Sequence, residues 1–214
     1  MNESLAIEAL CVLYADDIRH QKNLTSFRDG IRSAIRGYWD GSFRIGGFFQ
    51  EMKLLVEREL WIAFYEGAEL IGMSREDITS EERQRIEDEI NNQIDYIMPF
   101  AVDIRDGKEK GMSVDSFLSR AEMWVTRYGS IKALAQIMLG QDEKLEWEMG
   151  DTIEHCNSCL RLNGIVKRAS VWREAGIMPG NSPNEKLTCG GWKCRCKFRK
   201  TRKLCTSGPL PQVP

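Results

Sequence analysis

Cysteines are concentrated in the last third of this 214-residue chain. Five of its seven cysteines fall in two short stretches, HCNSCLRLNG (residues 155–164) and TCGGWKCRC (residues 188–196). These five are Cys156, Cys159, Cys189, Cys194 and Cys196. This feature constrains the fold more than any other, because the thiols must meet on a metal ion, pair as disulfides, or remain unliganded.

The rest of the sequence favours the metal. No stretch approaches the roughly eighteen consecutive apolar residues of a transmembrane helix. The acidic N-terminus, MNESLAIEALCVLYADD, lacks the basic segment and the cleavage site of a signal peptide. We therefore expect a protein made in a reducing cytoplasm, with no membrane partner, where clustered cysteines indicate a metal more often than a disulfide.

Zinc (Zn2+) fits this cluster because it takes four thiolate or imidazole ligands in a tetrahedron. The spacing assigns Cys156, Cys159 and Cys194 to the site. It leaves open whether Cys189 or Cys196 supplies the fourth ligand. Unliganded structural cysteines or a single disulfide are the alternative interpretation. The cysteines outside the cluster, expected to be a buried core thiol and a free thiol, are Cys11 and Cys205.

Neighbouring residues suit such a site. Gly190 and Gly191 would let the second loop turn tightly around the ion, and Lys193 and Arg195 would offset the negative charge of four thiolates. His155 could replace one thiolate but is expected to lie outside the ligand shell.

Most of the chain before the cysteines is predicted to be helical, because apolar residues recur there at three- and four-residue spacing. Thr79 with Glu82 has the sequence of a capping box, Pro99 should kink or end the helix that follows, and Ser113 and Gly140 should bound the last helix. The expected helical segments are 4–18, 26–39, 47–72, 81–104 and 114–139, with a break at Asp40-Gly41 and a turn at 105–113.

The composition changes after the stretch GQDEKLEWEMGD (residues 140–151), where glycine, proline and cysteine replace the helical pattern. We therefore predict a mainly α protein, a long-helix bundle followed by a small loop-rich zinc-binding module. The expected divisions are a helical domain at 1–145, the cysteine-rich module at 146–205 and an extended Pro-rich tail at 206–214. The module has few apolar residues, so a bound metal would supply folding energy that its core lacks.

A basic run lies at the end of the module, although the net charge of the chain is −2. It contains no acid and suits nucleic acid or an acidic partner, while a solvated surface is the simpler interpretation. Its members are Lys193, Arg195, Lys197, Arg199, Lys200, Arg202 and Lys203.

Catalytic motifs are missing from the sequence. There are two histidines, His20 and His155, and neither is placed to activate a cysteine nucleophile. No Gly-rich phosphate loop, serine elbow or metalloprotease motif is present. A site rich in thiolates is usually closed and structural. We therefore expect a protein that is not an enzyme.

The C-terminal third resembles the phage Mu F-like minor head protein family, also called the phage head morphogenesis family. The shared pattern is a tryptophan at Trp147, the C-x-x-C at 156–159, the LNG at 162–164 and the closing CGGWKCRC at 189–196. The similarity covers about residues 115–200. The sequence departs from the family pattern where the frequent His-Pro-Asn before CRC is replaced by CGGWK, which transfers the third ligand role to Cys189.

The resemblance implies a structural component of the phage head, associated with the portal protein or the inner capsid and located in the virion after assembly in the host cytoplasm. Its expected partners are the portal protein, the major capsid protein and, through the basic run, packaged DNA without sequence preference. The tail could dock in a groove of a neighbouring subunit. The alternative is a zinc-containing DNA-binding regulatory protein, and a zinc-dependent enzyme is a weaker third possibility.

Overall fold

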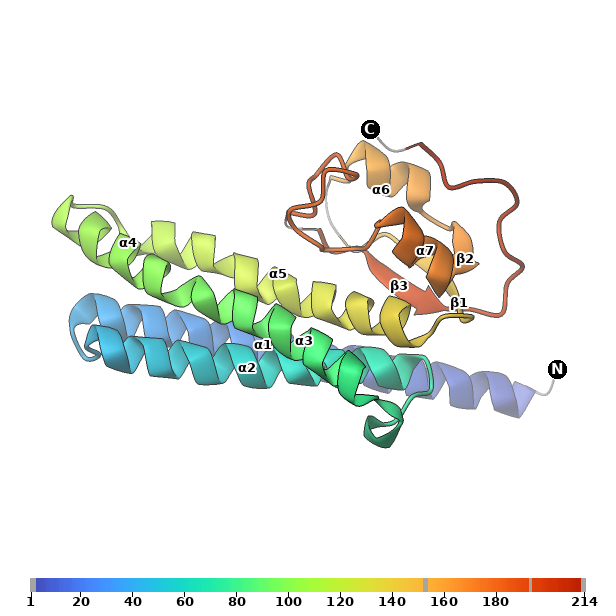
Figure 1. Cartoon of the computed structure of the whole chain (residues 1–214), viewed down its shortest axis with the longest axis horizontal. Coiled ribbons are helices and arrows are strands. Elements are labelled where there is room, and N and C mark those ends of the chain that lie inside the picture. The colour runs from blue at the N-terminus through green and yellow to red at the C-terminus, as the bar shows by residue number, and fades with distance from the viewer. Residues whose placement is uncertain (1–2, 152–153, 193, 213–214) are drawn as a thin grey trace.

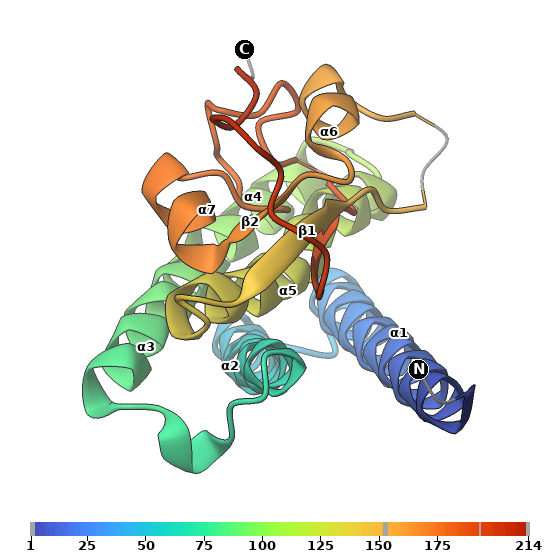
Figure 2. The same cartoon turned by 90° about the vertical axis from the view of Figure 1, so that its right-hand side faces the viewer.

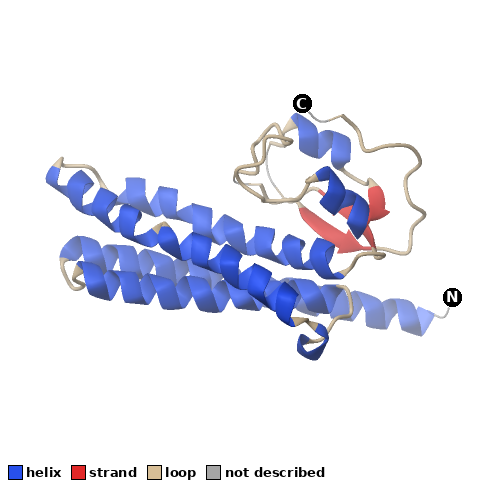
Figure 3. Ribbon diagram, in the orientation of Figure 1, coloured by secondary structure: helices blue, strands red, loops and turns tan. Residues whose placement is uncertain are grey.

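The computed structural model describes residues 3–151, 154–192 and 194–212, with side chains from residue 19 onward. An elongated helical bundle carries a small C-terminal body on one side of its last helix (Figures 1 and 3). None of the described helices combines the length and apolar character needed to cross a bilayer. The bundle elements are α1 (Glu3–Asp40), α2 (Ile45–Leu70), the short 3-10 helix η1 (Arg75–Asp77), α3 (Ser80–Asp95), α4 (Ile97–Glu109) and α5 (Val114–Leu139).

Helix α1 joins the two segments that the sequence pattern suggested separately, 4–18 and 26–39. The intervening residues, RHQKNLT, contain neither glycine nor proline, so nothing interrupts the backbone hydrogen bonds. The helix ends at Asp40, and Gly41 follows with a φ of 91°, as the expected break requires.

The predicted caps are confirmed. The Thr79 amide donates to Glu82 Oε2 at 3.0 Å, and the Glu82 amide donates to Thr79 Oγ1 at 3.2 Å, which closes a capping box on α3. Ser113 Oγ accepts the amide of Asp115 at the start of α5, which ends at Gly140. These bonds satisfy amides that have no partner within the helix.

Pro99 lies at an interruption of the helix predicted at 81–104, whereas Gly107, beyond that segment, does not interrupt α4. Pro99 has no amide to donate to the carbonyl of Asp95, and the helix is interrupted at Tyr96 between α3 and α4. The expected turn at 105–113 begins late, because α4 continues to Glu109. Gly107 lies inside α4, at a position where the ring of Phe117 leaves no room for a β-carbon.

The C-terminal body contains β1 (Lys144–Glu148), α6 (Asn157–Leu162), β2 (Val166–Arg168), α7 (Ala169–Ala175) and β3 (Lys197–Lys200). Its strands form an antiparallel sheet in the order β2-β1-β3, with Leu145 opposite Lys167 and Trp147 opposite Phe198. The sheet lies over the C-terminal half of α5 (Figures 1 and 2). Strand β1 crosses the expected boundary at 145/146.

Three aromatic residues join this body to the bundle. Trp147 and Trp172 are fully buried, and Phe198 is 3% exposed. Their ring centroids lie 5.2 to 5.9 Å apart, and each such pair contributes about 0.5–1.5 kcal/mol beyond its burial. They belong to the same contiguous core as the buried side chains of α1, α2 and α5. The mainly α fold is confirmed, and the small sheet is an addition to it.

The tail lies on its own C-terminal body. The Thr206 amide donates to the Val166 carbonyl at 2.8 Å, and Lys167 Nζ donates to the carbonyls of Thr206 and Gly208. Farther along, Arg161 donates to the carbonyl of Gln212 at 2.8 Å. Thr206 and Gly208 therefore lie against the outer edge of β2 and Gln212 lies against α6, while docking of the tail on a neighbouring subunit stays a prediction.

Candidate metal centre

The first two cysteines lie at the beginning of α6. Cys156 is the N-cap residue, and its Sγ accepts the amide of Cys159 at 3.4 Å. One turn of helix brings Cys159 Sγ to 3.2 Å from Cys156 Sγ. Cys159 is buried and Cys156 is half-buried. The C-x-x-C spacing thus folds into a knuckle with both sulfurs on the same side.

The second cysteine loop turns as the glycines predicted. Gly190 and Gly191 have φ values of 60° and 80°, where glycine is favoured. A β-carbon on Gly191 would overlap the backbone of Asn181, so the two chain segments touch at this glycine. The turn directs Cys189 and Cys194 back toward α6.

A polar contact fixes the loop against α6. Ser158 Oγ lies 2.7 Å from Thr188 Oγ1 and accepts the Thr188 amide at 2.8 Å. Ser158 has no exposed surface. Since Ser158 precedes Cys159 and Thr188 precedes Cys189, this contact aligns the two cysteine stretches.

The sulfur atoms form two overlapping groups. In each group, the sulfurs lie within 4.8 Å of one another, and Cys159 belongs to both. The groups are Cys156, Cys159, Cys189 and Cys159, Cys194, Cys196. The five cysteines singled out by the sequence are therefore brought together, and they could hold a metal ion.

Proton sharing within the cluster separates the pKa values of the thiols. Hydrogen bonds from Cys159 and Cys194 lower the pKa of Cys196 to about 3. The hydrogen bonds that Cys159 donates to Cys194 and Cys196 raise its own pKa far above the usual range. Burial raises the pKa of Cys189 to about 11. Only some of these sulfurs can ionise together, and a divalent cation would replace the shared protons and allow more thiolates to form.

Backbone amides supply further donors to the sulfurs. The amides of three glycines donate hydrogen bonds to cysteine sulfurs, and each bond favours the thiolate form. The pairs are Gly191 with Cys189, Gly180 with Cys194, and Gly150 with Cys196. Hydrogen bonds of this kind disperse the charge of a thiolate and fix the direction of its lone pairs. The sequence alone did not reveal these donors, because amides have no residue signature.

The remaining residues near the cluster take different positions. His155 lines a depression of about 350 Å3 beside the cysteines, together with Trp192 and Arg195, but it belongs to neither sulfur group. Cys205 is exposed, as expected of a free thiol. The side chain of Cys11 lies outside the described part of the structure, and so does the whole of Lys193, so the expectations for these two residues stay predictions.

Much of the basic run is engaged within the protein. Arg199 and Lys203 contact the buried Glu146 at 3.2 and 2.6 Å. Lys200 Nζ lies 3.0 Å from Glu143 and donates to the Ile71 carbonyl at the end of α2. A looser pair, of 3.8 Å, joins Lys197 to Glu148.

The acidic residues of β1 are the sequence feature that could have indicated that the basic run is paired within the protein. In KLEWE, alternation puts Glu146 and Glu148 on the face opposite Leu145 and Trp147, where β3 can pair with them. Among the described residues, the exposed Arg195 and Arg202 form no ion pair with a carboxylate.

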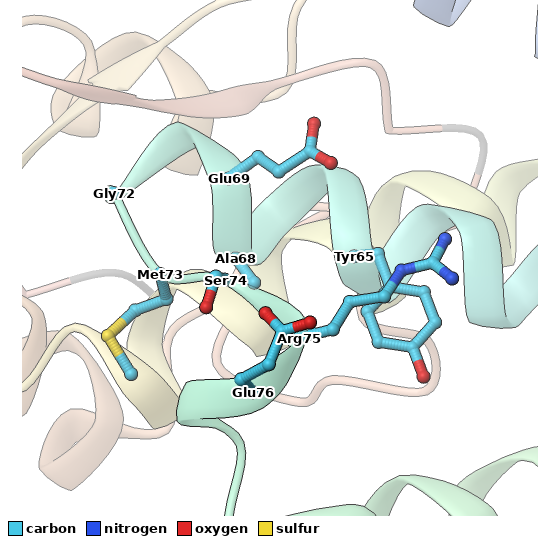
Figure 4. Close-up of a pocket in the computed structure, with 8 residues that line it drawn as sticks. All are labelled: Tyr65, Ala68, Glu69, Gly72, Met73, Ser74, Arg75 and Glu76. Atoms are coloured by element: carbon cyan, nitrogen blue, oxygen red, sulfur yellow. The ribbon is translucent and has the colours of Figure 1, made fainter.

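A second depression, of about 420 Å3, lies where α2 ends and η1 begins (Figure 4). The guanidinium of Arg75 lies 4.1 Å from the ring centre of Tyr65, and the Ser74 amide donates to Asp77 at 2.8 Å. Glu69 pairs with Arg19 of α1 at 2.8 Å, so most polar side chains of the depression have partners within the protein. Among the described residues, this depression contains no group of metal-ligating side chains.

Comparisons of the whole chain with protein-family models, with curated protein sequences and with solved structures found no match in any of the three.

Proposed function

We propose that this chain is a phage minor head protein, a structural component of head morphogenesis with a zinc module at its C-terminal end. The supporting observation is the meeting of the motif residues in space. The Gly164 amide donates to the Trp147 carbonyl at 2.8 Å, and Leu162 is fully buried beside the cysteine knuckle. Residues that are far apart in the motif thus form one structural unit, as expected of a motif whose parts pack on one another.

Zinc is the ion that suits this unit. Thiolates are soft ligands, and four of them in a tetrahedron are typical of a closed zinc site. Such a site leaves no open position for a substrate, so its role is structural and the protein is not an enzyme. The ion would join α6 to the loop that carries Cys189, Cys194 and Cys196.

The helical half is the proposed contact with the head. We assign it to the portal protein or the inner face of the major capsid protein, with few copies in each virion. Large apolar side chains exposed along the bundle support this assignment, because an interface would remove them from water. They are Leu54, Tyr96, Met98 and Met112.

The alternative is a zinc-containing DNA-binding regulator. The exposure of Arg195 and Arg202 favours it, since both guanidinium groups could reach phosphate. The ion pairs of Arg199, Lys200 and Lys203 count against it because these charges are already balanced within the protein. We therefore retain contact with packaged DNA only as a minor, sequence-independent part of the head function.

Mass spectrometry of purified proheads and virions tests the proposal. We expect the protein in a few copies per particle, and in complexes with the portal protein when the two are produced together. An abundance that equals the major capsid protein would make it a shell subunit. Complete absence from both kinds of particle would favour the regulator instead.

A further inference from the structure

Trp147 has a buried indole N–H without a conventional partner. Its side chain is fully buried, and Nε1 makes no hydrogen bond of standard geometry with the described residues. Other buried tryptophans differ, since Trp172 Nε1 donates to the Leu145 carbonyl at 3.1 Å and Trp124 Nε1 donates to the Gln93 carbonyl at 3.4 Å. A buried donor left unpaired is costly, so the exception requires an explanation.

The register of the sheet places Trp147 near the cysteine cluster. Trp147 lies opposite Phe198 in the sheet, and Cys196 is two residues before Phe198. The ring centroids of Trp147 and Phe198 are 5.7 Å apart. The indole N–H of Trp147 and the amide of Gly150 both lie within reach of the sulfur of Cys196.

A neutral thiol is a weak acceptor, whereas a thiolate accepts hydrogen bonds strongly. A metal-bound thiolate at Cys196 would therefore satisfy the buried N–H of Trp147. Metal ligands usually have such outer partners, which fix their orientation and adjust their electron donation.

We propose that Trp147 is a positioning residue of the metal centre, donating its indole N–H to the thiolate of Cys196 when the ion is bound. The inference rests on the proposed metal binding and deepens it, because it selects Cys196 as one of the ligands. It also links the ion to the core, since the same indole packs on Trp172 and Phe198 beneath the sheet. Metal binding would then stabilise the sheet on α5 as well as the loops.

Phenylalanine substitutions in the full chain provide the test, because Trp147→Phe and Trp172→Phe each remove one N–H and similar ring volume from the same aromatic cluster. Zinc affinity is measured by competition with a chelator, and cobalt is used to record the thiolate-to-metal charge-transfer band. We expect Trp147→Phe to weaken zinc binding about 10–100-fold and to shift the cobalt band. Trp172→Phe should retain the wild-type band and bind zinc more tightly than Trp147→Phe.

Equal affinities and equal bands in the two variants would overturn the role of Trp147, since both residues would then act only through packing. Failure of the wild-type protein to bind zinc or cobalt would instead overturn the metal centre itself.

A measurement on the wild-type protein removes the dependence on variant folding. With cadmium-113 bound, the indole proton of Trp147, identified by sequential resonance assignment, should display scalar coupling to the ion through the N–H···S bond. Absence of this coupling in a cadmium-loaded, folded protein would contradict the proposal.

Discussion

The Sγ atoms of Cys156 and Cys159 lie 3.2 Å apart at the beginning of α6. This distance is well beyond the roughly 2.05 Å of a disulfide bond. It is shorter than the edge of about 3.8 Å that follows from Zn–S distances of about 2.3 Å in a tetrahedron. An ion would need to separate the two sulfurs by about 0.6 Å, which a change of cysteine rotamer can supply.

The first prediction concerns metal content. Protein purified under reducing conditions should contain about one zinc per chain, because Cys159 is shared by both sulfur groups and a tetrahedral ion takes four of the five thiolates. Chelation should expose the amides of residues 154–164 and 176–196 to hydrogen exchange while α2 and α5 stay protected. A metal-free protein with these segments protected, or a Cys156–Cys159 disulfide, would contradict the assignment.

The central position of Cys159 gives the second prediction. Cys159→Ser should lower zinc affinity by more than the roughly 100-fold that loss of an outer-shell partner can cost, since it removes a sulfur common to both groups. Cys205→Ser is the matched control, because this thiol is exposed and lies in neither group. Chelator competition measures both, and similar affinities for the two variants would exclude Cys159 as a ligand.

Local signals in the sequence were sufficient for most of the helices. The Thr79–Glu82 box, Ser113 and Gly140 act within one turn of the chain, so their effects could be anticipated without tertiary information. The length of α4 could not, because it depends on Phe117 packing against Gly107 across a turn. The strands of the sheet were missed for a similar reason, since three to five residues carry too little periodicity.

The site was only partly predictable. Cysteine is the residue type that identifies a thiolate site, and its spacing identified the five sulfurs. The amide of Gly180 and the indole of Trp147 reach the cluster through tertiary folding, so spacing could not assign them. The basic run was interpreted as a surface because its partner, Glu146, lies on a strand that the sequence pattern did not reveal.

The crossing of α2 and α5 yields the third prediction. A β-carbon on Gly67 would overlap the Lys132 carbonyl oxygen and lie 2.8 Å from Ala135 Cβ. Backbone cannot move aside as a side chain can, so Gly67→Ala should lower the free energy of unfolding by at least about 2 kcal/mol. Urea denaturation measures the change.

Gly129→Ala is the control for that substitution. Gly129 lies in α5 with open space around its Cα, so alanine should raise stability by about 0.5–1 kcal/mol through its better helix propensity. A neutral Gly67→Ala would mean that the two helices are separated more widely in solution.

The fourth prediction concerns a buried carboxylate between α1, α2 and α5. Burial alone would raise the pKa of Glu66, but hydrogen bonds from His20, Tyr128 and Asn23 and the charge of Lys132 hold it at about 2. The folded pKa is below the ordinary value of 4.5, so Glu66 stabilises the protein above that pH and the contribution is lost as pH falls toward 2.

Glu66→Gln should therefore be most destabilising at neutral pH. The difference in the free energy of unfolding between Glu66→Gln and the wild type should shrink by about 3 kcal/mol between pH 7 and pH 2, as the shift in the pKa of Glu66 requires. Glu69→Gln breaks an exposed pair with Arg19 and should cost less than about 1 kcal/mol at pH 7. Urea titrations across this range check both variants, and a pH-independent difference for Glu66→Gln would contradict the network.

The last prediction distinguishes the basic residues that pair with carboxylates of the protein from those that are free to contact DNA. Replacing Arg199 and Lys203 would strip the buried Glu146 of its cations, so any loss of DNA binding could reflect damage to the sheet. Arg195 and Arg202 avoid this difficulty because both are exposed and neither pairs with a carboxylate among the described residues. Arg199→Ser should cost about 1.5–3 kcal/mol of stability, whereas Arg202→Ser should change it by less than about 0.5 kcal/mol.

For DNA, we expect the wild type to bind duplexes of unrelated sequence with a Kd of about 10–100 µM, weakening steeply as salt rises. The double variant Arg195→Ser, Arg202→Ser should bind more weakly and reduce the slope of log K against log salt by up to about 2, because each lost phosphate contact releases roughly one counterion fewer. Fluorescence anisotropy over a salt series measures both quantities. Affinity and slope that match the wild type would show that the run acts within the fold, where Glu143, Glu146 and Glu148 already neutralise most of it.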